Sequence, residues 1–269
     1  MTAPSPPGLR EWDSRTYHSI SAPQVSWGKN VLAKLSLRGD ETVLDAGCGT
    51  GRLTADLAGL LPRGRVIAAD QSINMLRAAR EFLSPFGSRV ELVLASVQTL
   101  PFRDAFDGIF STATFHWVQD HDRLFASLFA ALGPGGWLRA QCGGAGNLDR
   151  LLARVSRLSA TPPYAASFAG YESPWEFADA ETSARRLQRA GFVEIAADIE
   201  EAPVFFSNLP EYREFLRAVI LRDHIERIAD PQLQKTFLDE LARAAEKDRP
   251  MFALDYWRLN LRARKPLAG

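Results

Sequence analysis

The sequence predicts an α/β protein with a mostly parallel sheet and helices on both faces, in three layers. Three observations support this class. Short apolar runs alternate with amphipathic segments of helical period, glycine and proline residues fall between them, and a glycine-rich turn joins the first apolar run to the first helical segment. Such alternation is typical of βαβ units, in which each helix returns the chain so that successive strands run parallel.

The first unit contains the most informative segment of the chain, V-L-D-A-G-C-G-T-G-R over Val43–Arg52. A buried strand carries Asp45 near its carboxyl end and leads into Gly47, Gly49 and Gly51. Glycines permit positive φ and a close approach of a ligand to bare backbone, and the helix that follows presents a partial positive charge at its N-terminus. A carboxylate at this place suits a ligand ammonium group better than a phosphate. The segment therefore predicts a ligand-binding loop.

The spacing of these glycines disfavours two common nucleotide loops. A dinucleotide loop, Gly-x-Gly-x-x-Gly, needs a small residue at position 52, where this chain has Arg52. The phosphate loop of nucleotide hydrolases ends in Gly-Lys-Ser/Thr, and Gly51-Arg52-Leu53 has neither the lysine nor the magnesium-binding hydroxyl. A dinucleotide and ATP are both disfavoured.

The second strand adds an independent signal for a nucleoside. Arg65–Ala69 reads as a buried strand and ends in Asp70, 19 positions after Gly51. An acid at this place in a nucleotide-binding βαβ unit accepts hydrogen bonds from the ribose hydroxyls. The glycine loop and Asp70 together favour a ligand loop over a plain turn.

The rest of the chain continues the pattern and then departs from it. The elements expected after Asp70 are a helix from Ser72 to Phe82, strands Val90–Ala95 and Phe106–Ser111, helix Asp122–Leu132, strand Trp137–Cys142, helices Asn147–Leu158 and Glu181–Ala190, strand Phe192–Phe206, helices Pro210–Ala229 and Pro231–Lys247, and strand Met251–Arg264. The last two strands flank the charged helices, so they predict an antiparallel hairpin at the edge of the sheet.

Composition narrows the class of function. The chain has 269 residues, of which 46% are apolar and 24% charged, and its net charge is zero, so no overall field gathers nucleic acid or an anionic membrane. Cys48 and Cys142 form neither a disulfide framework nor a metal-binding spacing. No leader or membrane-spanning run is evident in the sequence. We expect a metal-independent, cytoplasmic protein that binds neither nucleic acid nor membrane.

These motifs resemble a known family. The Val43–Arg52 segment is similar to motif I, D-x-G-x-G-x-G, of the class I S-adenosylmethionine-dependent methyltransferases, Asp70-Gln71-Ser72 with Met75 resembles their acidic motif, and Ala95-Ser96-Val97 resembles their adenine-edge motif. The family usually has an aspartate where this chain has Ser96. The resemblance implies S-adenosylmethionine as cofactor, S-adenosylhomocysteine as product, and cofactor-binding roles for Asp45, Gly47, Gly49, Gly51, Asp70, Gln71, Met75, Ser96, Val97 and Ser111.

A narrower resemblance rests on three further segments. Ser111–Asp122, together with Trp12–Tyr17 and Trp257–Pro266, is similar to the trans-aconitate methyltransferase group and its juvenile-hormone-acid and malonyl-carrier-protein relatives, which methylate carboxylates. This resemblance implies a Rossmann-like, seven-stranded sheet whose last strand is antiparallel. It also implies one domain over residues 1–269, with a helical N-terminal cap at 12–36 and a helical substrate cover at 207–250.

The expected reaction is O-methylation of a small carboxylic acid. Attack of a carboxylate on a sulfonium removes two opposite charges, so a dry pocket favours the transition state and no strong base is needed. Alignment of the reactants can supply roughly 7 to 11 kcal/mol. Tyr17 and Trp27 are candidates for cation–π contact with the sulfonium, or for simple packing.

Other readings stay open. A hydroxyl, amine or carbon acceptor would need a base, for which His116 after the fourth strand is the candidate; an imidazole packed beside Trp117 and bonded to backbone is the alternative. Arg217 and Arg222 are candidates to clamp a substrate carboxylate, although the mixed charges around them favour a solvated, ion-paired face. A non-catalytic donor-binding module, a macromolecular methyltransferase and a dehydrogenase are the competing functions.

Overall fold

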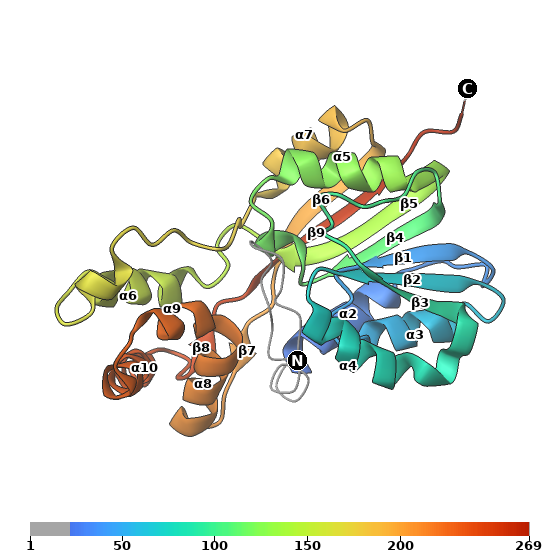
Figure 1. Cartoon of the computed structure of the whole chain (residues 1–269). Helices are drawn as coiled ribbons and strands as arrows, with labels where there is room; N and C mark the ends of the chain where they lie inside the picture. Colours follow the sequence, from blue (N-terminus) through green and yellow to red (C-terminus); the bar gives the residue numbers. More distant parts are fainter. Residues whose placement is uncertain (1–21, 269) are drawn as a thin grey trace. The chain divides into compact units, whose positions relative to one another are not determined.

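Seven strands pair side by side in the order β3-β2-β1-β4-β5-β9-β6 (Figure 1). The computed structural model describes residues 22–268, and these form two units. Unit 1 comprises residues 22–145, 174–199 and 259–268, and unit 2 comprises residues 146–173 and 200–258. The strands of the large sheet are β1 (Thr42–Ala46), β2 (Arg65–Asp70), β3 (Val90–Leu94), β4 (Phe106–Thr112), β5 (Leu132–Gly143), β6 (Val193–Glu201) and β9 (Trp257–Arg264).

Strand directions match the expected fold class. The β1–β2, β2–β3, β1–β4 and β4–β5 pairs are all parallel. Strand β9 runs antiparallel to β5. Lys265, late in β9 and its continuation, bonds to Gly135 and Gly136 early in β5, whereas the earlier Asn260 bonds to Gln141, further along β5. The prediction of a mostly parallel sheet whose last strand is antiparallel is confirmed.

Helices cover both faces of this sheet (Figure 1). One face carries α2 (Ala22–Leu32), α3 (Arg52–Leu60) and α4 (Ile73–Leu83), and the other carries α5 (His121–Ala131) and α7 (Ala180–Arg189). The larger core lies under the second set of helices and buries Leu124, Leu128 and Leu187 with strand residues such as Leu138. A separate core lies under α2 and α3.

Local signals in the sequence explain where these helices begin and end. The Ser72 hydroxyl accepts a hydrogen bond from the backbone N–H of Met75 at 3.2 Å and so caps α4, as predicted. Asp120 caps α5 through the N–H of Arg123. Gly191, with φ of 101°, follows the end of α7 in the left-handed region. The caps at Ser72 and Asp120 begin the helices that follow the carboxyl ends of β2 and β4.

Unit 2 is helical, with a small sheet of its own. Its helices are α6 (Asp149–Ser159), α8 (Leu209–Phe215), α9 (Arg222–Arg227) and α10 (Pro231–Ala245), and its antiparallel strands are β7 (Val204–Phe205) and β8 (Ala253–Leu254). Short helical turns η1 (Ser84–Arg89) and η2 (Phe115–Trp117) lie in unit 1, and η3 (Ala165–Phe168) and η4 (Leu216–Ile220) in unit 2. The buried side chains of unit 2 include Tyr164, Tyr212 and Phe237.

Both late strands were predicted too long. The predicted strand Phe192–Phe206 ends as β6 at Glu201, because Pro203 has no N–H to donate to a sheet. The predicted strand Met251–Arg264 is interrupted at Asp255, whose backbone carbonyl and side chain instead accept hydrogen bonds from the start of α6. The outer ends of the two predicted strands pair with each other as β7 and β8.

The prediction of one continuous helix over Pro210–Ala229 is also wrong. It contains α8, then the π-helical turn η4, then α9. Val219, Ile220 and Leu221 are all buried. Three consecutive positions of a regular helix point in different directions, so the wider turn allows the neighbouring apolar side chains to be buried together.

No helix within residues 22–268 is long and apolar enough to span a bilayer.

Candidate functional site

The glycine loop between β1 and α3 contains three residues with positive φ angles. These are 85° at Gly47, 54° at Gly49 and 83° at Gly51. A Cβ on Gly47 would lie 2.2 Å from Thr114 Oγ1, and one on Gly51 would lie 2.7 Å from Leu83 Cδ1, whereas a Cβ on Gly49 would meet no atom within 4 Å. Packing therefore requires two of the glycines, and the third leaves open space beside bare backbone.

Asp70 ties this loop to the end of β2. One carboxylate oxygen accepts the N–H of Gly49 at 2.9 Å, and the other accepts the N–H of Ser72 at 2.9 Å. An ionised carboxylate has about four acceptor sites, so more than two hydrogen bonds can converge on such a group. The acid is thus oriented by two backbone donors while it faces the cavity described next.

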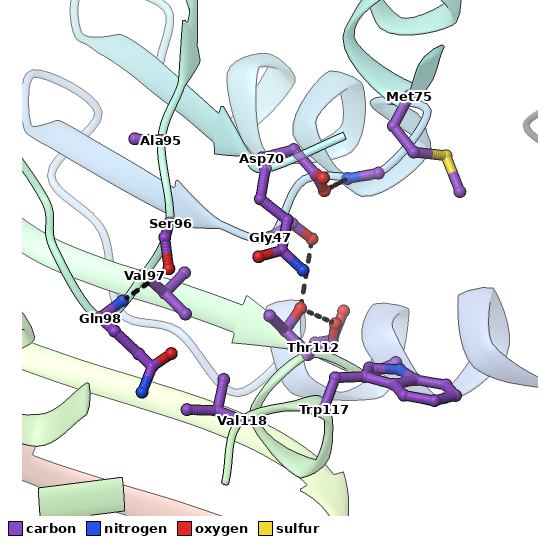
Figure 2. A pocket seen from close by; sticks show the side chains of 14 residues that line it. Gly47, Asp70, Met75, Ala95, Ser96, Val97, Gln98, Thr112, Trp117 and Val118 are labelled. Carbon is purple, nitrogen blue, oxygen red and sulfur yellow. Dashed lines mark hydrogen bonds between the residues drawn. The ribbon is translucent and has the colours of Figure 1, made fainter. Parts of the chain in front are cut away.

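The main cavity opens beside the loop, at the carboxyl ends of the parallel strands (Figure 2). Side chains from four separate chain segments converge on it. Its walls are formed by Gly47, Gly49, Asp70, Gln71, Met75, Ala95, Ser96, Val97, Gln98, Thr112, Ala113, Thr114, Trp117 and Val118. Seven of these residues were predicted as cofactor-binding from the sequence: Gly47, Gly49, Asp70, Gln71, Met75, Ser96 and Val97.

A smaller cavity, here called the side cavity, lies against the same loop. It shares Gly47, Gly49, Thr112 and Ala113 with the main cavity. Its further lining residues are Gln24, Val25, Asp45, Cys48, Thr50, Arg52 and Leu53. The two cavities together leave room for a ligand that crosses the glycine loop.

Asp45 is the buried acid of the side cavity. Its carboxylate accepts a hydrogen bond from Thr54 Oγ1 at 2.6 Å. Burial raises its pKa to about 7, with a further increase from the charge of Asp70, and the Thr54 bond acts in the opposite direction. The side-chain oxygen of Gln24, in α2, is also buried and has no hydrogen-bond partner among the described residues. Two acceptors thus meet at the side cavity, where a ligand cation would satisfy both.

The segment after β4 contributes lining residues that were not predicted to bind the cofactor, namely Ala113, Thr114 and Trp117. Ala113 has a φ of 55°, uncommon for a residue with a side chain, and its N–H bonds to Gln141 O at 2.8 Å. The Thr114 hydroxyl lies within hydrogen-bond distance of two carbonyls, those of Thr112 and Gly47, and can donate its proton to either. Trp117 closes one side of the main cavity (Figure 2). The sequence signals for this wall are its place after a parallel strand, where the carboxyl ends form the ligand edge, and the resemblance carried by Ser111–Asp122.

Two residues predicted to bind cofactor line neither cavity. Gly51 packs against Leu83 as described above. Ser111 is buried, and its hydroxyl donates to the carbonyl of Ala46 at 2.6 Å, which links the ends of β4 and β1. The geometry gives both residues a structural role in shaping the loop.

His116 is placed unfavourably for a base. It is buried, lines neither cavity, and its Nδ1 accepts the N–H of Gly143 at 3.2 Å. Its ring packs against Trp117 and Phe177, with centroids 5.2 and 5.9 Å away. With Nδ1 accepting, a neutral ring carries its proton on Nε2, and the acceptor nitrogen is already engaged by the backbone. The other predicted catalytic residue, Tyr17, lies outside the described residues, as do Trp12–Thr16.

The remaining polar candidates are accounted for by local contacts. Arg217 pairs with Glu214 at 2.6 Å and Arg222 with Glu226 at 2.6 Å, so both take part in helix-surface ion pairs, as the mixed charges predicted. His121 is buried and its Nε2 lies 3.0 Å from Phe115 O. Within residues 22–268, no group of three or more histidine, cysteine, aspartate or glutamate residues is arranged to hold a metal ion.

Comparisons with known proteins show similarity to methyltransferases. Residues 43–136 match the family model described as "Methyltransferase domain", and this stretch holds the glycine loop, Asp70 and Trp117. A trans-aconitate 2-methyltransferase of Methylobacterium radiotolerans is 28% identical over 88% of this chain and 90% of its own length. One of Azoarcus sp. is 35% identical over 59% of this chain, and the match spans only 60% of the Azoarcus protein.

The fold is also similar to that of a solved structure. Phosphoethanolamine N-methyltransferase 2 of Haemonchus contortus superposes with a TM-score of 0.62 at 19% identity, over 94% of this chain and 57% of that one. At this identity the similarity concerns the fold.

Proposed function

We propose that this chain, which belongs to the class I S-adenosylmethionine-dependent methyltransferases, transfers a methyl group from S-adenosylmethionine to a carboxylate of a small molecule. The observation that carries the proposal is the pair of cavities joined at the glycine loop, with an ordered acid, Asp70, at one and a buried acid, Asp45, at the other. S-adenosylhomocysteine is then the product that must leave both.

The lining residues fit the parts of this donor. Asp70 would accept hydrogen bonds from the ribose hydroxyls, and Gln71 and Met75 would contact the adenine with Ser96 and Val97. Asp45 and the Gln24 oxygen, which has no partner among residues 22–268, would accept hydrogen bonds from the ammonium group. Gly49 leaves space for close approach of the donor to backbone. When bound, the donor supplies an electrophilic methyl group on a sulfonium.

Ser96 stands where the family usually has an aspartate. Its hydroxyl oxygen accepts the N–H of Gln98 at 3.3 Å, and its own proton remains available as a donor. A serine hydroxyl therefore replaces an aspartate at the adenine edge with a neutral group. We expect the ribose contact at Asp70 to contribute more to donor affinity than any contact at Ser96.

The chain's contribution to catalysis is alignment and exclusion of water. Trp117 and Val118 form an apolar wall of the main cavity, next to the strained turn at Ala113. An ionised carboxylate that enters against this wall loses water and needs no proton removed, so its reaction with a sulfonium is favoured in such surroundings. The engaged Nδ1 of His116 agrees with a reaction that uses no base.

The relatives support the carboxylate as acceptor. The two similar proteins named above are trans-aconitate 2-methyltransferases. Among the described residues that line the two cavities, Arg52 is the only basic side chain, and it lies at the side cavity. We therefore expect an acid with fewer charged groups than a tricarboxylate, whose apolar part contacts Trp117.

The test is transfer of labelled methyl groups. The protein is incubated with methyl-labelled S-adenosylmethionine and either a small-metabolite extract, trans-aconitate or phenylacetate, and the products are treated with mild base. Methyl esters release labelled methanol, which supports the proposal. Label kept in the products means ether, amine or carbon methylation, and donor binding without transfer in any mixture means a donor-binding module; either contradicts it. An Asp70→Ala variant, which should not bind the donor, is the control.

A further inference from the structure

Unit 1 has another cavity, here called the basic cavity, formed by residues that line neither the main nor the side cavity. It lies on the sheet face opposite α5 and α7. Residues of β5, β9 and β6 line it, together with the loop after α2. Its lining residues are Lys34, Leu35, Ser36, Trp137, Leu138, Arg139, Glu194, Arg262, Ala263 and Arg264. Four cationic side chains thus surround one carboxylate.

Alternation along the strands explains why these charges share a face. Leu138, Leu259, Leu261 and Ala263 point into the core beneath α5 and α7. Because successive side chains of a strand point to opposite faces, residue 139 of β5 and residues 262 and 264 of β9 point away from that core. The face they occupy is polar, and it carries the hydrogen bonds from Gln141 to Asn260 and from Asn260 to Asp198.

Arg139 and Arg262 are cross-strand neighbours of like charge. The register that pairs Gln141 with Asn260, and Gly136 with Lys265, places Arg139 opposite Arg262. Burial lowers the pKa of Arg139, and the charge of Arg262 lowers it further, against the opposing effect of Asp198. Like charges directly opposite each other in a sheet are destabilising. The pair therefore lowers the stability of the protein unless something neutralises it.

Nothing in the described part of the chain neutralises this pair directly. Arg264 pairs with Glu194 at 3.5 Å, and Asp198 accepts a hydrogen bond from Asn260. Neither Arg139 nor Arg262 makes a hydrogen bond or ion pair with another described residue. On β6, the register of Asn260 with Asp198 and Arg264 with Glu194 places Ala196, which carries no charge, across from Arg262.

We propose that the basic cavity binds a small polyanion, a molecule with at least two adjacent phosphate or carboxylate groups, between Arg139 and Arg262. Two guanidinium groups from neighbouring strands present several N–H donors to one recess, an arrangement suited to bidentate bonds with phosphate or carboxylate oxygens. Lys34 and Arg264 add charge at its border. The site does not depend on methyl transfer, because its residues are separate from both loop cavities.

The test uses inorganic pyrophosphate as the probe. Binding is measured by titration calorimetry on the full chain, with ionic strength held constant by sodium chloride, for the unaltered protein and for Arg139→Met, Arg262→Met and the double variant. Each lost arginine should weaken pyrophosphate binding at least about tenfold. Arg80→Met is the matched control, because Arg80 is an exposed arginine on α4, away from the basic cavity.

Two further readouts separate this site from simpler explanations. The double variant should bind S-adenosylhomocysteine with unchanged affinity, since it leaves the loop cavities intact. In phosphate-free, low-salt buffer it should melt at a higher temperature than the unaltered protein, because the like-charge pair is gone. Conversely, pyrophosphate should raise the melting temperature of the unaltered protein and leave that of the double variant unchanged.

Three outcomes would overturn the proposal. The first is pyrophosphate binding that is equal in the unaltered protein and the double variant. The second is no binding beyond that of chloride at the same ionic strength. The third is a dimer, found by analytical ultracentrifugation without added anion, that the double variant dissociates, since the arginines would then serve contact between two copies of this chain.

Discussion

At the residue scale, the raised pKa of Asp45 makes stability depend on pH. In the free protein its pKa of about 7 lies well above its ordinary value of 3.8, so the folded state holds this proton more tightly than the unfolded state does. Stability is therefore lost as pH rises from about 4 to about 7 and is constant above that range. A shift of about 3 pKa units corresponds to as much as about 4 kcal/mol.

Donor affinity should have the opposite dependence on pH. The ammonium group of the donor favours ionised Asp45, so affinity for S-adenosylhomocysteine should rise by up to about tenfold per pH unit towards pH 7 and then level off. We expect Asp45→Asn to lose this dependence and to be more stable than the unaltered protein at pH 7.5. Calorimetric titrations between pH 5 and 7.5 measure both proteins while the ligand amine stays protonated. An equally steep dependence in Asp45→Asn would show that another group is responsible.

His116 offers a second residue-scale prediction. Glutamine can also accept the N–H of Gly143, so His116→Gln should reduce kcat for a carboxylate acceptor by less than about tenfold and leave the shape of its pH profile unchanged. Steady-state kinetics from pH 6 to 9 check this. A loss of about 100-fold, together with disappearance of an acidic limb near pH 6 to 7, would identify the imidazole as a general base and would count against transfer by alignment alone.

At the element scale, the glycine loop separates packing from ligand binding. Gly49 and Gly51 both have positive φ, so an alanine at either place costs about 1 to 2 kcal/mol of backbone strain. Only at position 51 does the new Cβ also overlap a side chain, that of Leu83 on α4, which adds about 1 to 3 kcal/mol. The same substitution, two residues apart, should therefore have different consequences.

We expect Gly51→Ala to lower the free energy of unfolding more than Gly49→Ala does, and Gly49→Ala to weaken donor binding more than Gly51→Ala does. The reason for the second effect is that the Cβ at position 49 enters the open space of both cavities. Urea unfolding and S-adenosylhomocysteine titration on the two variants measure both quantities. If the two alanines affected binding equally, the donor would not pass beside Gly49.

At the scale of the whole molecule, unit 2 has its own stabilising centre. Arg154 makes two hydrogen bonds with Asp248, at 2.9 and 2.5 Å, and both side chains are largely buried. Burial alone would raise the pKa of Asp248, but the bonds and charge of Arg154 outweigh it and lower that pKa. Loss of one partner of such a pair costs about 3 to 5 kcal/mol, because it leaves the other charge buried alone.

Asp248→Asn should therefore destabilise unit 2 and leave the donor site of unit 1 intact. If residues 207–250 form the acceptor cover that the sequence analysis predicts, the variant should raise KM for the acceptor while the Kd for S-adenosylhomocysteine stays unchanged. Kinetics and calorimetry separate the two. A matched control is Arg217→Met, which removes an exposed helix-surface ion pair. An unchanged acceptor KM in an Asp248→Asn protein with a lowered melting temperature would exclude the covering role.

The amino-acid sequence by itself determined the βαβ order, the direction of the last strand and half of the residues that line the main cavity. These features depend on neighbouring residues: Gly47, Gly49 and Asp70 lie within one strand–loop–helix–strand unit, and alternation of apolar segments specifies the elements. The same locality explains why the ends of the helices were predicted closely, as the Ser72 cap of α4 shows.

Tertiary structure alone decided the rest, because it depends on residues distant in the sequence. It bonded Ser111 to Ala46 and His116 to Gly143, and it placed Gln24 and Asp45 at one cavity. It also interrupted the predicted strand Met251–Arg264, through the bonds that Asp255 accepts from the start of α6. No local pattern encodes such contacts, since each joins segments whose distance in space is set only when the sheet and its helices have packed.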